Sequence, residues 1–300
     1  MDLGLKGKEG TMVTLETIET LYSQGTAEHR EDGFFVNPPF FGVVDGFSSP
    51  YHYKMKQIRF GGFSGGEMVR QVILKTFYNA KPDFSLKEII LRANQGIGAI
   101  QTTRGIPIDR ADRLAGASFV FTKVKTETIE IIQGGDCLAV WLYASGEIGA
   151  TKNQAYQHVS KNLVIIAELM DKHNHDRKEM WIEFYPILSR QRQQDINQKT
   201  EAGYAILSGQ PSLEECWLKV EIPVERLKLL LLFTDGFVPY SETAEEMKMA
   251  KRLITDYEKW GLDGILKRKR QKDKREEEKS YIAQDEATAI ALNFNPELQS

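Results

Sequence analysis

The feature that most constrains the fold is a β-prone apolar run that ends on an acidic residue. Residues 40–49 read FFGVVDGFSS and residues 227–237 read LKLLLLFTDGF, so both runs stop at Asp-Gly. Asp tolerates tight turns and Gly adopts positive φ at no steric cost, so each pair alone predicts a turn. Asp136 lies between two further strand-like runs, and Asp285 lies just ahead of another. This recurrence of acidic strand ends indicates a site.

Composition narrows the class of protein. The 300 residues are 41% hydrophobic, which is enough for a sizeable core, and the formal net charge of −3 gives no electrostatic reason to expect nucleic acid or an anionic membrane as partner. The longest apolar run is too short to span a bilayer, and the N-terminus lacks an apolar signal core, so a cytoplasmic location is expected. Two cysteines provide neither a disulfide framework nor a zinc site. The sequence makes no prediction of oligomeric state.

Periodicity predicts strands towards both ends of the chain and helices between them. Residues 12–23 alternate apolar and polar side chains like a half-buried strand, and residues 32–46 read as two strands joined by Asn-Pro-Pro. Residues 65–80 and 85–103 carry apolar side chains on one helical face, with Ser85 as the N-cap of the second helix. These patterns predict a hairpin followed by two amphipathic helices.

The rest of the chain predicts an α+β layered fold. Residues 116–149 predict a three-stranded meander, and residues 160–200 predict polar helices that cover the sheet or form a flap. A strand, a helical region at 241–270 and a last strand follow. No linker rich in Pro, Gly or Ser divides the sequence, so residues 1–300 are expected to form a single domain. The basic run at 267–279 is followed at once by acids, which is typical of a solvated helix face or loop.

The acidic strand ends suit one kind of chemistry. Mg²⁺ and Mn²⁺ are hard cations that take oxygen ligands, and two such ions close together can activate a water and neutralise a phosphate. Carboxylates at the ends of adjacent strands suit this task because rigid strands fix their positions. The pattern therefore favours a divalent-metal site.

The motifs also resemble a known family. EDGFFVNPPFFGVVDG, GASFVF, GGDCLAVWLYASGEI, LLLLFTDGF and DEATAIAL occur in the order and approximate spacing of the metal-dependent protein phosphatases of the protein phosphatase 2C type, over residues 12–294. The resemblance implies a four-layer α-β-β-α sandwich, in which two antiparallel β-sheets are flanked by helices. It also implies a centre of two Mn²⁺ or Mg²⁺ ions and the hydrolysis of phosphoserine and phosphothreonine in proteins.

The resemblance assigns metal-site roles position by position. Asp45 corresponds to the acid that bridges the two ions, and the carbonyl of Gly46 corresponds to the backbone ligand beside it. Asp235 and Asp285 correspond to two further aspartates of the centre. A water activated between the ions is then expected to attack phosphorus in line, without a phosphoenzyme and without a further catalytic side chain.

Three more acids have roles in the outer part of this centre. Glu31 and Asp32 correspond to the acidic pair that contacts metal-bound water, and Asp136 corresponds to the ligand of a third, weaker ion. The expected cofactors are therefore two Mn²⁺ or Mg²⁺ ions, with a weak third ion, and the expected partner is a phosphoprotein substrate.

The chain departs from the family pattern at three positions. Ala27 stands where the family has an arginine that holds the substrate phosphate, so Arg30 or Arg59 is expected to take this role. Phe47 stands where His or Met is usual, and Pro239 replaces another metal-site aspartate.

An insertion at residues 50–60, which contains His52, and the segment 160–200 are expected to carry specificity. The departures leave a second interpretation open: a phosphatase-like module, catalytically weak or inactive, that binds a phosphoprotein or a regulatory partner. A third interpretation is a structural α+β domain with acidic turns, which predicts no effect of metal on thermal unfolding.

Overall fold

Two antiparallel sheets form the centre of the molecule. The computed structural model describes residues 2–6, 12–50, 58–280 and 285–296. Most of the expected insertion at 50–60, including His52, lies outside these residues. In the six-stranded sheet the strand order is β1 (Asp2–Lys6), β2 (Met12–Ser23), β11 (Ala287–Phe294), β10 (Leu227–Phe233), β7 (Leu138–Tyr143) and β8 (Ile148–Ala150). In the five-stranded sheet it is β3 (Asp32–Asn37), β4 (Phe40–Phe47), β5 (Gly116–Val124), β6 (Thr128–Gly134) and β9 (Leu218–Pro223).

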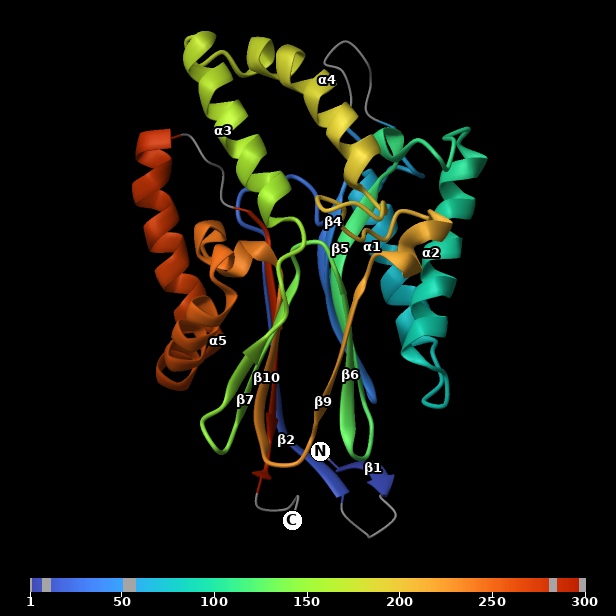
Figure 1. The fold of residues 1–300 in the computed structure, drawn as a ribbon, viewed down its shortest axis with the longest axis vertical. Coiled ribbons are helices and arrows are strands. Elements are labelled where there is room, and N and C mark those ends of the chain that lie inside the picture. Colours follow the sequence, from blue (N-terminus) through green and yellow to red (C-terminus); the bar gives the residue numbers. More distant parts are fainter. Residues whose placement is uncertain (1, 7–11, 51–57, 281–284, 297–300) are drawn as a thin grey trace.

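Helices cover the outer faces of the two sheets. Helices α1 (Gly65–Tyr78) and α2 (Leu86–Thr103) pack on the five-stranded sheet, and α5 (Glu246–Ser280) lies on the six-stranded sheet (Figure 1). The layers run helix, sheet, sheet, helix, which confirms the predicted four-layer sandwich. The predicted hairpin is β3–β4. The predicted three-stranded meander was wrong in part: β5 and β6 pair in the five-stranded sheet, whereas β7 belongs to the six-stranded sheet, where it pairs with β10 and β8.

Strand alternation divides the buried side chains between three cores. On β4, Phe41 and Val43 face the other sheet, whereas Phe40 and Val44 face α1 and α2. This is the period-two pattern of a strand that is buried on both faces. The inter-sheet core continues across Leu230 and other apolar residues of β10 and β11. Position 45 therefore falls on the inter-sheet side, at the open end of the sandwich.

Capping boxes define where α1 and α2 begin. The hydroxyl of Ser64 accepts a hydrogen bond from the backbone N–H of Glu67, and the carboxylate of Glu67 accepts one from the backbone N–H of Ser64. Ser85 and Glu88 form the same reciprocal pair, which confirms Ser85 as the predicted N-cap. Each box satisfies two backbone donors that a helix start would otherwise leave unpaired.

Segment 160–200 forms two helices that stand over one end of the sandwich. These are α3 (Tyr156–Lys172) and α4 (Arg177–Asp195), which lie at the top of Figure 1 above the ends of β4 and β5. The hydroxyl of Ser189 donates to the Asp112 carboxylate at 2.9 Å, and the amide of Gln193 donates to a backbone carbonyl at 2.9 Å. The C-terminal part of α4 is therefore held against the body of the protein.

The basic run at 267–279 was predicted to be a solvated helix face or loop, but part of it is buried. The run belongs to the C-terminal part of α5. This helix is kinked at Gly261, where φ is 63°. The side chains of Lys269 and Arg270 are only 11% and 13% exposed, and both pair with Asp273. Arg270 also donates to the backbone carbonyl of Asp285. The prediction was wrong for these two residues, because the helix packs this face towards the end of the sandwich.

In the part of the chain that the structure describes, no helix is long and apolar enough to cross a membrane.

Candidate metal centre

The register of the five-stranded sheet places polar residues in a row at its open end. Asp32 at the start of β3 is paired with Asp45 near the end of β4, and Asp45 is paired with Ser118 on β5. Directly opposed residues lie about 4.5–5.5 Å apart on the same face of a sheet. Asp32 and Asp45 thus both project towards the six-stranded sheet, in the direction in which Val43 is buried.

Two threonines of the opposite sheet hold the Asp32 carboxylate. The hydroxyls of Thr234 and Thr288 donate to the same oxygen, Oδ2, at 2.8 and 2.9 Å. Thr288 also donates its backbone N–H to the hydroxyl of Thr234 at 3.0 Å, so the two threonines form a connected unit. Asp32 is only 2% exposed. These bonds join the two sheets at the level of the acidic row and fix the position of this carboxylate.

Asp235 approaches the acidic row from the six-stranded sheet. It begins a short 3₁₀ turn, Asp235–Phe237, directly after β10. A side chain at the next position, Gly236, would collide with the backbone carbonyl of Glu286, so only glycine allows this close approach. Burial raises the pKa of the Asp235 carboxyl well above 3.8, and the nearby acids raise it further, while a hydrogen bond with Asp45 opposes the shift.

The pKa values of the other acids show how closely the charges lie. Burial, followed by repulsion from Asp32 and Asp235, raises the pKa of Asp45 well above 3.8. Burial raises the pKa of Asp32 to about 7, although its threonine hydrogen bonds act in the opposite direction. Burial also raises the pKa of Asp136, which follows β6 and hydrogen-bonds Ser118. Carboxylates drawn from both sheets therefore destabilise one another's ionised forms in this structure.

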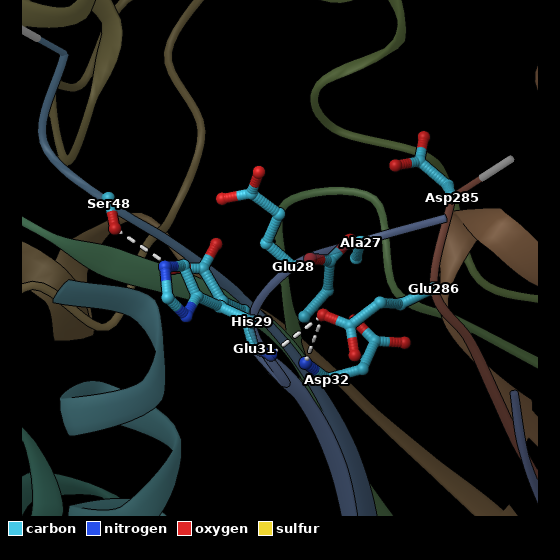
Figure 2. Close-up of a pocket in the computed structure, with 10 residues that line it drawn as sticks. Ala27, Glu28, His29, Glu31, Asp32, Ser48, Asp285 and Glu286 are labelled. Carbon is cyan, nitrogen blue, oxygen red and sulfur yellow. Dashed lines mark hydrogen bonds between the residues drawn. The ribbon is translucent and has the colours of Figure 1, made fainter. Parts of the chain in front are cut away.

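Glu286 was missed by the sequence reasoning, although it follows a predicted ligand. Its carboxylate accepts hydrogen bonds from the backbone N–H groups of Glu31, at 2.7 Å, and Asp32, at 3.1 Å, as Figure 2 shows. Its other oxygen accepts from the hydroxyl of Tyr22 at 2.7 Å. Glu286 thus connects β11 to the turn before β3. A carboxylate directly after Asp285 was the only signal in the sequence, and its partners are more than 250 positions away along the chain.

The side chain of Glu31 is held at the start of α1. Its Oε1 accepts from the hydroxyl of Ser48 at 2.9 Å and from the hydroxyl of Ser64. Gly46 donates its N–H to the backbone carbonyl of Glu31 at 3.2 Å, and a Cβ at position 46 would lie 2.7 Å from that carbonyl oxygen. The backbone at Gly46 is therefore packed too closely for a larger residue.

A cavity of about 240 Å³ opens at this end of the sandwich. Figure 2 shows acidic side chains from both sheets around it. Its lining consists of Ala27, Glu28, His29, Glu31, Asp32, Asp45, Gly46, Ser48, Asp285 and Glu286. No Lys or Arg of the described chain is among these lining residues. The cavity is thus strongly acidic, and its oxygen-rich donor set is of the type that Mg²⁺ and Mn²⁺ prefer.

Asp285 lies at the rim of this cavity and is exposed. Burial of its carboxyl raises the pKa of Asp285 above 3.8, and Asp136 and Glu286 raise it further, whereas the nearby Lys269 and Arg270 oppose the shift. Asp285 therefore shares the raised pKa of the other predicted aspartates, although two basic side chains lie near it.

The predicted ligands gather at one end of the molecule but do not yet form a coordination cluster. Among the described residues, no group of three or more His, Cys, Asp or Glu side chains lies close enough to hold a metal ion. The residue types nevertheless fit divalent ions, because buried carboxylates with mutually raised pKa values are stabilised when a cation neutralises them. Asp32, Asp45, Asp136 and Asp235 share this electrostatic environment.

The candidate phosphate-binding arginines lie outside the cavity lining. The guanidinium carbon of Arg30 lies 3.9 Å from the centre of the Tyr22 ring. Arg59 hydrogen-bonds the ring of His29 through Nη1 at 2.9 Å. Neither residue contributes to the wall of the acidic cavity. Pro239 lies beyond the Asp235 turn, where it precedes a second short 3₁₀ turn.

Comparison with known proteins identifies the fold. No family model and no curated protein matches the sequence. The catalytic domain of the serine/threonine protein phosphatase PstP, in complex with two manganese ions, superposes with a TM-score of 0.54 at 13% identity, over 93% of this chain and 97% of that one. PppA of Pseudomonas aeruginosa, a regulatory component of the T6SS, gives 0.54 at 16%, over 94% and 99%. The PPM Ser-Thr phosphatase MsPP of Mycobacterium smegmatis gives 0.52 at 14%, over 94% and 100%. The resemblance seen in the motifs thus extends to three dimensions, and the chain has the fold of the serine/threonine phosphatases of the protein phosphatase 2C type.

Proposed function

We propose that this protein hydrolyses phosphoserine and phosphothreonine in proteins with the help of two bound Mn²⁺ or Mg²⁺ ions. The observation that carries the proposal is the convergence of Asp32, Asp45 and Asp235 from two sheets, each with a pKa raised by burial. Such an arrangement costs stability unless a cation neutralises it, so it has a physical reason to exist in a protein that binds metal.

Two groups of residues have distinct proposed roles, in metal binding and in the orientation of water. Asp45, the backbone carbonyl of Gly46, Asp235 and Asp285 are proposed to hold the two ions, and Asp136 a weaker third. When bound, the ions supply an activated water and neutralise charge on the phosphoryl group. Glu31 and Asp32 are proposed to orient water at the site. Their positions are set by Glu286 and by the threonine pair of the opposite sheet.

The proposed functional unit is one phosphatase domain that spans residues 1–300, with its core at 12–294. The acceptor surface for a phosphoprotein would lie around the acidic cavity, below α3 and α4. These helices and the insertion at 50–60 are proposed to select the substrate, because segments around a rigid site usually carry specificity.

The test is hydrolysis of p-nitrophenyl phosphate and of a phosphothreonine peptide, with EDTA and with Mn²⁺. Turnover is expected only with the metal, and Asp45→Asn and Asp235→Asn are expected to abolish it. Asp83→Asn, which changes an exposed loop carboxylate of the same type, serves as the matched control. Equal turnover by Asp235→Asn and Asp83→Asn proteins would refute the proposal.

A phosphatase-like binding module is the second candidate. It is favoured by one observation: within the described ranges the acids do not form a ready three-ligand cluster. This candidate predicts that the wild-type protein binds a phosphothreonine peptide but releases no phosphate in either Mn²⁺ or Mg²⁺. Release of inorganic phosphate at a rate that depends on Asp235 would exclude it.

A further inference from the structure

Among the described residues, the acidic cavity offers no Lys or Arg side chain to the substrate. A phosphorylated side chain carries a charge of about −1.5 to −2 at neutral pH, and proteins usually bind its oxygens with Arg or Lys. In the described chain, neither residue type lines the acidic cavity, and Arg30 and Arg59 are engaged with Tyr22 and His29. The proposed metal ions would neutralise part of this charge, but a guanidinium or ammonium donor to the phosphoryl oxygens would have to come from another part of the fold.

A second cavity shares Asp45 with the first. It measures about 220 Å³ and lies between the end of the five-stranded sheet and the helices α3 and α4. Asp45, Ser118 and Asp136 line it on the sheet side. His158 and Arg192 line it on the helix side. Arg192 is the only Lys or Arg among the described residues that line either cavity.

Arg192 is partly buried, and its guanidinium has few partners. Its guanidinium carbon lies 4.5 Å from the centre of the Phe47 ring, and its Nη1 donates a long hydrogen bond, 3.4 Å, to the backbone carbonyl of Ser48. In the part of the chain that the structure describes, no carboxylate forms an ion pair with it. Burial lowers the pKa of Arg192. A desolvated cation without a counter-ion is costly, and an anionic ligand would remove that cost.

The position of Arg192 is fixed by its helix. Asp195, one turn further along α4, pairs with His158 of α3 through Oδ2 and Nδ1 at 3.0 Å. Ser189, one turn earlier, donates to Asp112, and Gln193 donates to the carbonyl of Asp109. These bonds hold the last turns of α4 over the cavity. Such preorganisation is what a binding residue requires.

The cavity also contains an unpaired buried polar atom. Asn162 of α3 is 8% exposed and lines the cavity, and its Oδ1 has no hydrogen-bond partner. Buried polar groups are nearly always hydrogen-bonded, so this amide oxygen has room for a donor. Phosphoryl oxygens only accept hydrogen bonds, so the donor would be a backbone N–H of the phosphopeptide and not the phosphate itself.

We propose that Arg192 binds the phosphoryl oxygens of the phosphoserine or phosphothreonine substrate, and that the cavity below α3 and α4 is the substrate-phosphate site. The inference rests on the proposed function and assigns the residue that holds the phosphate. It also gives Phe47 a role: its ring supports the guanidinium from the sheet side, at the position where the family pattern has His or Met. The arginine replaced by Ala27 is thus supplied from a different element.

The experiment compares Arg192→Ala and Arg192→Lys with Arg190→Ala, which removes an exposed arginine of the same helix. Binding of inorganic phosphate to each Mn²⁺-supplemented protein is measured by titration calorimetry, and KM and kcat are measured with a phosphothreonine peptide. Arg192→Ala is expected to weaken phosphate binding and raise KM by about 10- to 100-fold, the usual effect of losing a charge-assisted hydrogen bond. Arg192→Lys is expected to recover part of the affinity, because lysine keeps the charge but not the planar fork. Arg190→Ala is expected to match the wild type.

The outcomes separate this inference from the proposed function. Turnover in the wild type, with phosphate affinity and KM unchanged in both Arg192 variants, would overturn the inference and leave the phosphatase proposal standing. Wild-type phosphate binding that depends on Arg192, without any turnover, would support the site and refute hydrolysis. A wild-type protein that neither binds phosphate nor turns over the peptide would overturn both. Equal melting temperatures of the Arg192→Lys and wild-type proteins would show that the substitution leaves the fold intact.

Discussion

The substitution Asp45→Asn is predicted to stabilise the metal-free protein. Asp45 is half-buried between Asp32 and Asp235, and all three carboxyls have raised pKa values. A carboxyl whose pKa is raised on folding favours the folded state below its unfolded pKa and progressively destabilises it as the pH rises towards the folded pKa. At pH 7.5 the acidic row is therefore destabilising, and the near-isosteric change to Asn removes one source of repulsion.

The size of this destabilisation can be worked out from the pKa of Asp32. Its pKa of about 7 compares with an ordinary value of 3.8. At about 1.4 kcal/mol per pH unit, this difference corresponds to a cost on the order of 4 kcal/mol at neutral pH, shared among several neighbours. Removal of one of these charges is expected to raise the free energy of unfolding by about 1–2 kcal/mol. This corresponds to a rise in melting temperature of about 2–6 °C for a chain of this size.

The assay is thermal unfolding at pH 7.5 in EDTA and in Mn²⁺. In EDTA, Asp45→Asn is expected to melt above the wild type, whereas Asp83→Asn is expected to melt with it. In Mn²⁺ at 100 times its dissociation constant the wild type should gain about 2.7 kcal/mol by mass action, and Asp45→Asn should lose most of that gain. An Asp45→Asn protein that is less stable than the wild type in EDTA and gains as much from Mn²⁺ would refute the reasoning.

Three further predictions concern single side chains. Glu130 pairs with Lys219 and Lys125, and although burial acts against it, these bonds lower its pKa. Glu130→Gln should therefore cost about 1 kcal/mol of unfolding free energy in a urea titration at pH 7, and the difference from wild type should shrink as the pH falls below the ordinary value of 4.5 and vanish below the lowered folded-state pKa. Glu286→Ala leaves two backbone N–H groups without their acceptor and should cost about 2–3 kcal/mol by the same measurement; a cost below 0.5 would contradict its structural role. Gly46→Ala should reduce metal-dependent turnover about tenfold or more while the far-ultraviolet circular dichroism stays unchanged, because a Cβ there meets backbone.

Local patterns were sufficient for most of the fold. The alternation in residues 12–23 and the Asn-Pro-Pro turn before β4 predicted β2 and the β3–β4 hairpin, since both signals depend on neighbours in sequence. The same holds for Ser85 and its capping box. The prediction for the basic run at 267–279 was wrong for Lys269 and Arg270, because their packing depends on how α5 meets the end of the sandwich.

For the site, the sequence by itself determined which residues are acidic strand ends, because the alternation of each strand and its Asp-Gly turn are local properties. Asp45 and Asp235 could therefore be named without a structure. Only the tertiary structure decided what surrounds them. Glu286 reaches the backbone of Glu31 across 255 positions, and Arg192 reaches the same end of the sandwich from a helix that no motif marks. Such contacts are set by sheet register and helix docking, which bring distant segments together and leave no periodic trace in the chain.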